Sequence, residues 1–109
     1  MAYKLIVTEQ ADMLISNLTG YLLFKLNNID AAKHLLDELE SVYLRLKENP
    51  YQFSQSKDNY LFGKGYREAL LPEMNYRIVF RIEETQVYIV GVFHDREDYG
   101  FKVKWVSTY

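Results

Sequence analysis

The apolar positions change their spacing after the first seven residues of the chain. Residues 3–7 carry apolar side chains at every second position, which predicts a short strand. From residue 9 onward, apolar residues recur every three or four positions and predict an amphipathic helix over residues 9–28. This stripe consists of Ala11, Leu14, Ile15, Leu18, Leu22, Leu26 and Ile29. Thr8 stands where its hydroxyl would cap the start of the helix.

A second amphipathic helix follows almost at once. Its stripe is formed by Ala32, Leu35, Leu36, Leu39, Val42, Tyr43 and Leu46. Asp30 is placed to cap its start. The helix is expected to end before Asn49, because a residue that precedes a proline is pushed out of the helical region. The pair Asn27 and Asn28 suits a tight break between the two helices, and with so short a joint we expect them to lie antiparallel as a helical hairpin.

The second half of the chain has the period of strands. Residues 51–64 show no clean period and are expected to form a loop. Residues 66–71 predict a strand that Pro72 closes, and residues 76–82 alternate as a further strand. Residues 87–93 are apolar on both faces, which is typical of a central strand with cover on each side.

The C-terminal tail alternates once more. Phe101, Val103 and Trp105 stand opposite Lys102 and Lys104, and this pattern predicts an edge strand or an extended arm within residues 101–109.

The order of these elements predicts an α+β fold. An N-terminal strand and an antiparallel helical hairpin precede a mainly antiparallel sheet of three to four strands. The hairpin should cover one face of the sheet, with Tyr76, Ile78, Phe80 and Ile82 turned toward it. We expect one domain that spans residues 1–109.

Composition narrows the possible classes of protein. The 109 residues are 49% hydrophobic and 26% charged, as in soluble globular domains, and the net charge is −2. The absence of cysteine excludes a disulfide framework, a zinc ribbon and a thiolate nucleophile. The N-terminus lacks a signal-peptide pattern, and the longest apolar run falls far short of the roughly 20 residues that span a bilayer. A cytoplasmic protein is therefore expected.

Three stretches of the second half, in this order and spacing, resemble a known family. They are GYRE at residues 65–68, NYRIVFRI at residues 75–82 and VYIVGVFHDR at residues 87–96. Together with the order of the elements, they resemble the RelE/ParE superfamily of bacterial type II toxin–antitoxin toxins. The ending with His94 and Arg96 is more similar to the ParE-like branch.

The resemblance implies a small toxin of a plasmid-stabilisation-like system, neutralised by a cognate antitoxin protein. It implies that ParE-like members block DNA gyrase without cutting RNA, and we expect this chain to act by binding such a protein target. The first alternative is a ribosome-dependent mRNA interferase, a metal-independent endoribonuclease that cleaves mRNA on the ribosome. The second alternative is an inactive fold member that serves only as an antitoxin-binding module.

Arg77 and Arg81 are the first candidate site residues. They stand four positions apart on one predicted strand, so both project to the face opposite the helices and could clamp a phosphate. The resemblance favours a functional role for Arg77, because the RNA-cutting branch of the family keeps an arginine at the matching position. The alternative is that each arginine pairs with a carboxylate across the sheet, such as Glu68.

His94 is the candidate proton donor or acceptor, with Asp95 placed to orient it. The alternative is a strand-end histidine that bonds a backbone carbonyl. Arg96 matches the turn arginine of the family, which implies a catalytic, phosphate or target contact. Arg67 and Tyr99 complete the candidates for binding the target or a phosphate.

Charge favours a protein target over a nuclease. Residues 57–81 hold five basic and three acidic side chains, a modest basic patch on an acidic protein. His34 lies off the apolar stripe of its helix and is expected at the surface. Because neither histidine has a cluster of ligands near it in the sequence, we expect no metal site and no cofactor.

Overall fold

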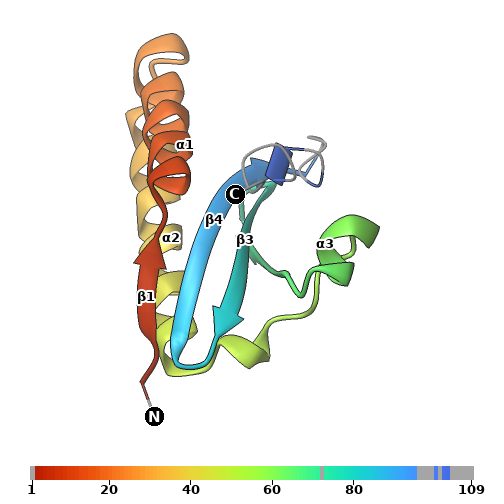
Figure 1. Ribbon diagram of the computed structural model, residues 1–109. Helices are drawn as coiled ribbons and strands as arrows, with labels where there is room; N and C mark the ends of the chain where they lie inside the picture. Colours follow the sequence, from red (N-terminus) through yellow and green to blue (C-terminus); the bar gives the residue numbers. More distant parts are fainter. Residues whose placement is uncertain (1, 72, 96–99, 101, 104–109) are drawn as a thin grey trace.

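Four strands form one mixed sheet in the computed structural model, which describes residues 2–71, 73–95, 100, 102 and 103. Figure 1 shows the helices beside this sheet. In spatial order the strands are β1 (Lys4–Val7), β4 (Gln86–His94), β3 (Tyr76–Glu83) and β2 (Arg67–Leu71). β1 runs parallel to β4, and the other two pairs are antiparallel. The α+β class is confirmed, and β4 is a central strand as predicted.

Two helices form the predicted hairpin beside the sheet. α1 (Glu9–Gly20) begins at Thr8, whose Oγ1 accepts from the Ala11 N–H at 3.2 Å, so the predicted cap is confirmed. α2 (Ile29–Glu48) lies antiparallel to α1 and ends before Asn49, also as predicted (Figure 1). Its cap is Asn28 rather than Asp30, because the Asn28 Oδ1 accepts from the Ala31 N–H at 2.9 Å.

The end of the first helix differs from the prediction of one regular helix to residue 28. After Gly20 the backbone widens into a single π-helical segment, Tyr21–Lys25. It ends where the Leu26 N–H donates to the Tyr21 carbonyl at 3.1 Å and the Asn28 N–H donates to the Leu22 carbonyl at 2.8 Å. Asn27 between them takes a left-handed φ of 49°, which turns the chain toward α2.

The main core lies between the hairpin and the sheet. Ile78 and Phe80 of β3 are fully buried there, and Tyr76 and Ile82 pack at its margin, so the predicted helix-facing side of this strand is confirmed. The other buried members are Ala11, Leu22, Ala32, Leu35, Leu39, Val42, Leu46, Phe53, Ala69, Leu71, Val87, Ile89 and Val92.

The opposite face of the sheet carries a second, smaller core. Its buried members are Leu61, Tyr66, Val79, Val90, Phe93 and Val103. Leu61 belongs to α3 (Asn59–Gly63), a short helix that Asp58 caps by accepting from the Leu61 N–H at 3.0 Å. The prediction of a loop over residues 51–64 was wrong at this helix, because one buried leucine and one cap are too few to produce a visible helical period.

A β-bulge in β4 makes this second core possible. Val79 pairs with Gly91 but Phe80 pairs with Ile89, so Val90 is an extra residue opposite β3. The side-chain alternation of β4 therefore changes at this point, and both faces of the strand are buried, as the apolar run predicts.

Few residues of the C-terminal tail are described. Gly100, Lys102 and Val103 are helical, where the prediction for residues 101–109 expects a strand or an arm. Val103 is fully buried in the second core. The predicted site residues Arg96 and Tyr99, and residues 101 and 104–109, lie outside the described residues.

Candidate functional site

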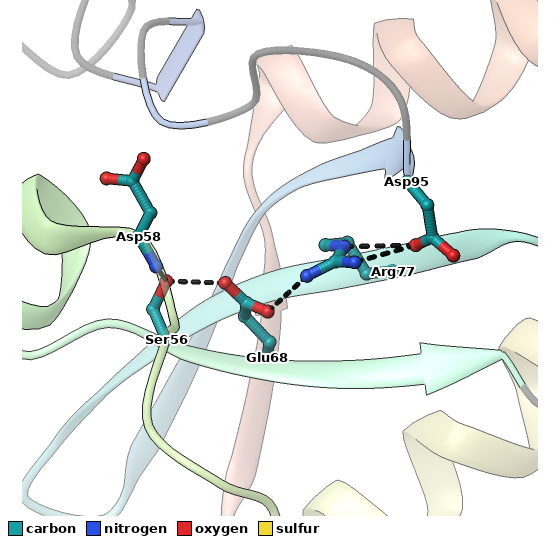
Figure 2. A network of polar contacts seen from close by, with 5 residues as sticks. All are labelled: Ser56, Asp58, Glu68, Arg77 and Asp95. Carbon is teal, nitrogen blue, oxygen red and sulfur yellow. Dashed lines mark hydrogen bonds and ion pairs between the residues drawn. The ribbon is translucent and has the colours of Figure 1, made fainter.

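The sheet face away from the hairpin holds a chain of polar contacts around Arg77 (Figure 2). The Arg77 Nη1 donates to the Glu68 Oε1 at 2.6 Å, and its Nη2 and Nε donate to the Asp95 Oδ1 at 2.8 and 3.2 Å. The Arg77 side chain is 14% exposed and that of Glu68 is 5% exposed. All three guanidinium nitrogens therefore donate to carboxylates in a shielded position.

The contacts continue from Glu68 to the segment before α3. The Glu68 Oε2 accepts from the Ser56 Oγ at 2.5 Å, and this hydroxyl oxygen accepts from the Asp58 N–H at 3.2 Å (Figure 2). The network thus joins β2, β3, the end of β4 and the start of α3. Ser56 was not predicted, because a serine in an aperiodic segment gives no sequence signal.

The alternative prediction for Arg77, a pair with Glu68 across the sheet, is confirmed. Glu68 lies opposite Val79 and Arg77 opposite Leu70, so the two charged residues are diagonal neighbours on one face of the strands. Two carboxylates surround one guanidinium, and the local sum of these three charges is negative. From these three side chains, a phosphate would therefore meet no net positive charge.

Arg81 lies on the same face and is more accessible. Its side chain is 32% exposed, its Nη1 donates to the Glu83 Oε1 at 3.1 Å, and its guanidinium lies 4.4 Å from the centre of the Tyr88 ring. This arginine borders a cleft of about 840 Å³ between the start of α1 and the sheet. The cleft is lined by Thr8, Glu9, Gln10, Met13, Tyr66, Arg81, Glu83 and Val90, a mixture of charged and apolar groups.

Arg67 and His94 belong to the other face. Arg67 lies opposite Phe80, donates from its Nη1 to the Phe53 carbonyl at 2.7 Å and stacks 5.0 Å from the centre of the Tyr51 ring. His94 lies opposite Tyr76, with the two rings edge to face at 5.2 Å. The fold therefore brings Arg77 and Arg81 to one face and separates them from Arg67 and His94.

The expected partnership of Asp95 with His94 differs from the contacts observed. Asp95 follows β4, its N–H donates to the Asn75 carbonyl at 2.9 Å, and its carboxylate accepts from Arg77. Successive residues of an extended chain point to opposite sides, and this places Asp95 with Arg77 on the face away from the hairpin.

A third group of ionisable side chains lies at one side of the hairpin. The His34 Nε2 lies 3.4 Å from the Glu38 Oε1 and 3.0 Å from the Glu73 Oε2. His34 and Glu38 share a face of α2, whereas Glu73 follows β2. The spacing of His34 and Glu38 is visible in the sequence, but the approach of Glu73 depends on the fold.

The titration of Tyr43 is clearly shifted. Burial, with a smaller contribution from the charge of Asp12, raises the pKa of the Tyr43 hydroxyl from 10.0 to about 12. This hydroxyl is buried in the groove between α1 and α2, and within the described part of the chain no group hydrogen-bonds it.

No helix in the described ranges has the length and apolar character needed to cross a membrane.

Comparisons with known proteins agree with the fold. Residues 5–99 match the family model described as the ParE toxin of the type II toxin–antitoxin system parDE. No curated protein matches the sequence.

Three solved structures share the architecture at low sequence identity. A chain of the chromosomal ParDE toxin–antitoxin system of P. aeruginosa is 15% identical, with a TM-score of 0.69 over 85% of this chain and 96% of that one. A doubly substituted E. coli toxin RelE in the free state is 17% identical, with a TM-score of 0.65 over 100% of both chains. The RelBE2 toxin–antitoxin complex of Mycobacterium tuberculosis contains a chain that is 21% identical, with a TM-score of 0.58 over 86% and 99% of the chains.

Proposed function

The chain belongs to the family of ParE toxins of type II toxin–antitoxin systems, and from this premise we propose that it acts by binding a protein target rather than by cutting mRNA. DNA gyrase is the target that the ParE-like resemblance implies. A cognate antitoxin is the partner that neutralises it.

The state of Arg77 is the observation that supports this proposal most. A metal-independent ribonuclease needs cations beside the scissile phosphate to stabilise the charge that develops there. The guanidinium of Arg77 donates to Glu68 and Asp95 instead, and both of those partners are acidic. The residue therefore serves to join strands and suits a binding module better than a phosphate site.

The separation of the other candidates supports the same proposal. General acid–base catalysis requires the proton-transferring group within hydrogen-bond reach of the reacting atoms, on the same side as the charge-stabilising cation. His94 shares the face of Tyr76, toward the hairpin, whereas Arg77 projects to the opposite face. A net charge of −2 adds little attraction toward the phosphate-rich ribosome.

The edge of β2 is a candidate surface for the antitoxin. The segment before α3 covers only the first half of this edge, where the Ser56 N–H donates to the Tyr66 carbonyl and the Glu68 N–H donates to the Ser54 carbonyl. By the alternation of the strand, the N–H and C=O groups of Leu70 also point away from β3, and its side chain is 55% exposed. An antitoxin segment could add a strand there.

The test is expression of the chain without an antitoxin in a bacterial host that lacks the locus. We expect growth arrest with accumulated DNA breaks and full-length transcripts. Arg77→Lys keeps a positive charge beside Glu68, and His94→Gln keeps a polar side chain, so both variants should remain toxic if they fold.

Two outcomes would contradict this proposal. Transcripts truncated at codon positions, with cleavage abolished by Arg77→Lys or His94→Gln, would identify an mRNA interferase. Normal growth with a soluble, folded product would identify an inactive member of the fold.

A further inference from the structure

Three metal-ligating side chains converge where α2 passes the turn between β2 and β3. His34 and Glu38 are one helical turn apart on α2, and Glu73 approaches from the turn. One nitrogen of His34 and one carboxylate oxygen from each glutamate all lie within 4.8 Å of one another. The group is separate from the Arg77 network and from the cleft beside Arg81.

The distances suit ligands that share one small cation. Zinc binds histidine nitrogen and carboxylate oxygen at about 2.0–2.2 Å, so neighbouring ligand atoms in its tetrahedral shell are about 3.3–3.5 Å apart. The His34 Nε2 lies 3.4 Å from the Glu38 oxygen and 3.0 Å from the Glu73 oxygen. Small changes of side-chain torsion would bring all three onto one ion.

The charges also favour a cation at this position. The Nε2 of His34 carries at most one proton, yet two carboxylates approach it. Asp37 and Ser41 line the same shallow hollow, and Asp37 brings a third carboxylate. Even a protonated imidazole would leave the group of His34, Asp37, Glu38 and Glu73 with a negative sum.

We propose that His34, Glu38 and Glu73 bind a divalent transition-metal ion, for which Zn²⁺ is the most suitable probe. Imidazole together with carboxylate is a donor set that zinc accepts, and Asp37 or water can complete the tetrahedron. The ion fastens α2 to the β2–β3 turn, where the side chain of Glu73 is otherwise 72% exposed. Because the ligands converge only in the folded chain, binding stabilises the fold. This inference is independent of the proposed toxin activity.

The test is calorimetric titration of Zn²⁺ into the tag-free chain at pH 7.5 without chelator. We expect one Zn²⁺ per chain and a rise of the melting temperature when Zn²⁺ is in excess. His34→Gln and Glu73→Gln should each weaken the affinity about tenfold or more, since changes in the outer shell of metal sites already cost that much. Glu73 is largely exposed, so its replacement should leave the fold intact.

Two control variants show whether Zn²⁺ binds at this site or binds histidine and carboxylate side chains in general. Glu48→Gln changes an exposed carboxylate near the end of the same helix, and His94→Gln changes the other histidine of the sequence. Both should bind Zn²⁺ as the unmodified chain does. Absence of saturable binding, or an affinity unchanged by Glu73→Gln, would overturn the proposal, as would an equal loss in His94→Gln.

Discussion

Arg77 and Glu68 form an ion pair across adjacent strands, with the Nη1 and Oε1 atoms 2.6 Å apart and both side chains largely shielded from water. The pair sits beside the second core, and the carboxylate of Asp95 holds the other side of the guanidinium. The positive charge of Arg77 is therefore balanced by two carboxylates of the protein, those of Glu68 and Asp95. We therefore expect the stability of the fold to depend on this ion pair.

Removal of Arg77 should destabilise the fold strongly. In Arg77→Ala the carboxylate of Glu68, which is 5% exposed, keeps its charge in a buried site without the guanidinium. Breaking a buried pair from one side costs about 3–5 kcal/mol, so we expect the free energy of unfolding to fall by about that much. Urea denaturation at pH 7 measures it.

Arg81→Ala is the matched control on the same strand and face. Its ion pair with Glu83 is more accessible, with side chains 32% and 57% exposed, and exposed pairs contribute about 0–1 kcal/mol. If Arg77→Ala and Arg81→Ala lowered the free energy of unfolding equally, burial would not make the Arg77 pair more stabilising than the exposed Arg81 pair.

Gly91 is expected to tolerate no larger residue. A Cβ on Gly91 would overlap the ring of Phe93, which is buried in the second core. Gly91→Ala should therefore lower the free energy of unfolding by about 1–3 kcal/mol through overpacking. Thermal melting followed by circular dichroism provides the measurement.

In contrast to Gly91→Ala, we expect Gly20→Ala at the end of α1 to stabilise the fold. A Cβ there meets nothing within 4 Å, and alanine favours a helix by about 1 kcal/mol over glycine. The variant should melt at a higher temperature than the unmodified chain. If Gly91→Ala melts as high as Gly20→Ala, the close approach of Phe93 to Gly91 is contradicted.

Alkaline pH should weaken the fold through Tyr43. Burial raises the pKa of this hydroxyl to about 12, above its value of 10.0 in an unfolded chain. Between these values the folded state retains a proton that the unfolded state has released, so stability falls as the pH rises from 10 to 12. The slope should be about 1 kcal/mol or less per pH unit, because water partly screens the site.

Tyr43→Phe isolates this contribution from the other nine tyrosines. It removes a buried hydroxyl that has no hydrogen bond in the described structure, so the variant should be as stable as the unmodified chain at pH 7 or more stable. Urea midpoints at pH 9 and 11 should differ less in Tyr43→Phe. If the midpoint fell by the same amount between pH 9 and 11 in the unmodified chain and in Tyr43→Phe, groups other than Tyr43 would cause the loss of stability at alkaline pH.

Leu70 tests the proposed surface for the antitoxin. Leu70→Lys keeps the exposed edge of β2 but places a charge where an added strand would pack, so binding to the cognate antitoxin should weaken about tenfold in calorimetry. Leu44→Lys is the control, because Leu44 is similarly exposed but lies on α2. An unchanged affinity in Leu70→Lys would exclude strand addition at this edge.

Elements with a strong local pattern could be predicted from the sequence. The hairpin and the central strand follow from their apolar spacing, and the cap at Thr8 and the helix end before Asn49 follow from single residues. The pairing of Arg77 with Glu68 could be stated as an alternative, because alternating strands allow such a contact.

The features that could not be predicted from the sequence arise from contacts between segments that are far apart along the chain. The bulge at Val90 depends on register with β3, and α3 owes its place to the buried contacts of Leu61. Asp95 lies next to His94 in the sequence, but strand geometry turns it to Arg77. Glu73 meets His34 only because the sheet lies against α2, so this group of side chains gives no signal in the sequence.

We have proposed that this toxin binds a protein target and does not cut mRNA. The most direct measurement incubates the purified, tag-free chain with DNA gyrase, ATP and relaxed plasmid, and in parallel with translating ribosomes and a defined mRNA. We expect loss of supercoiling with cleaved plasmid, while the mRNA stays intact. Cleavage of the mRNA at codon positions, with gyrase fully active, would contradict it.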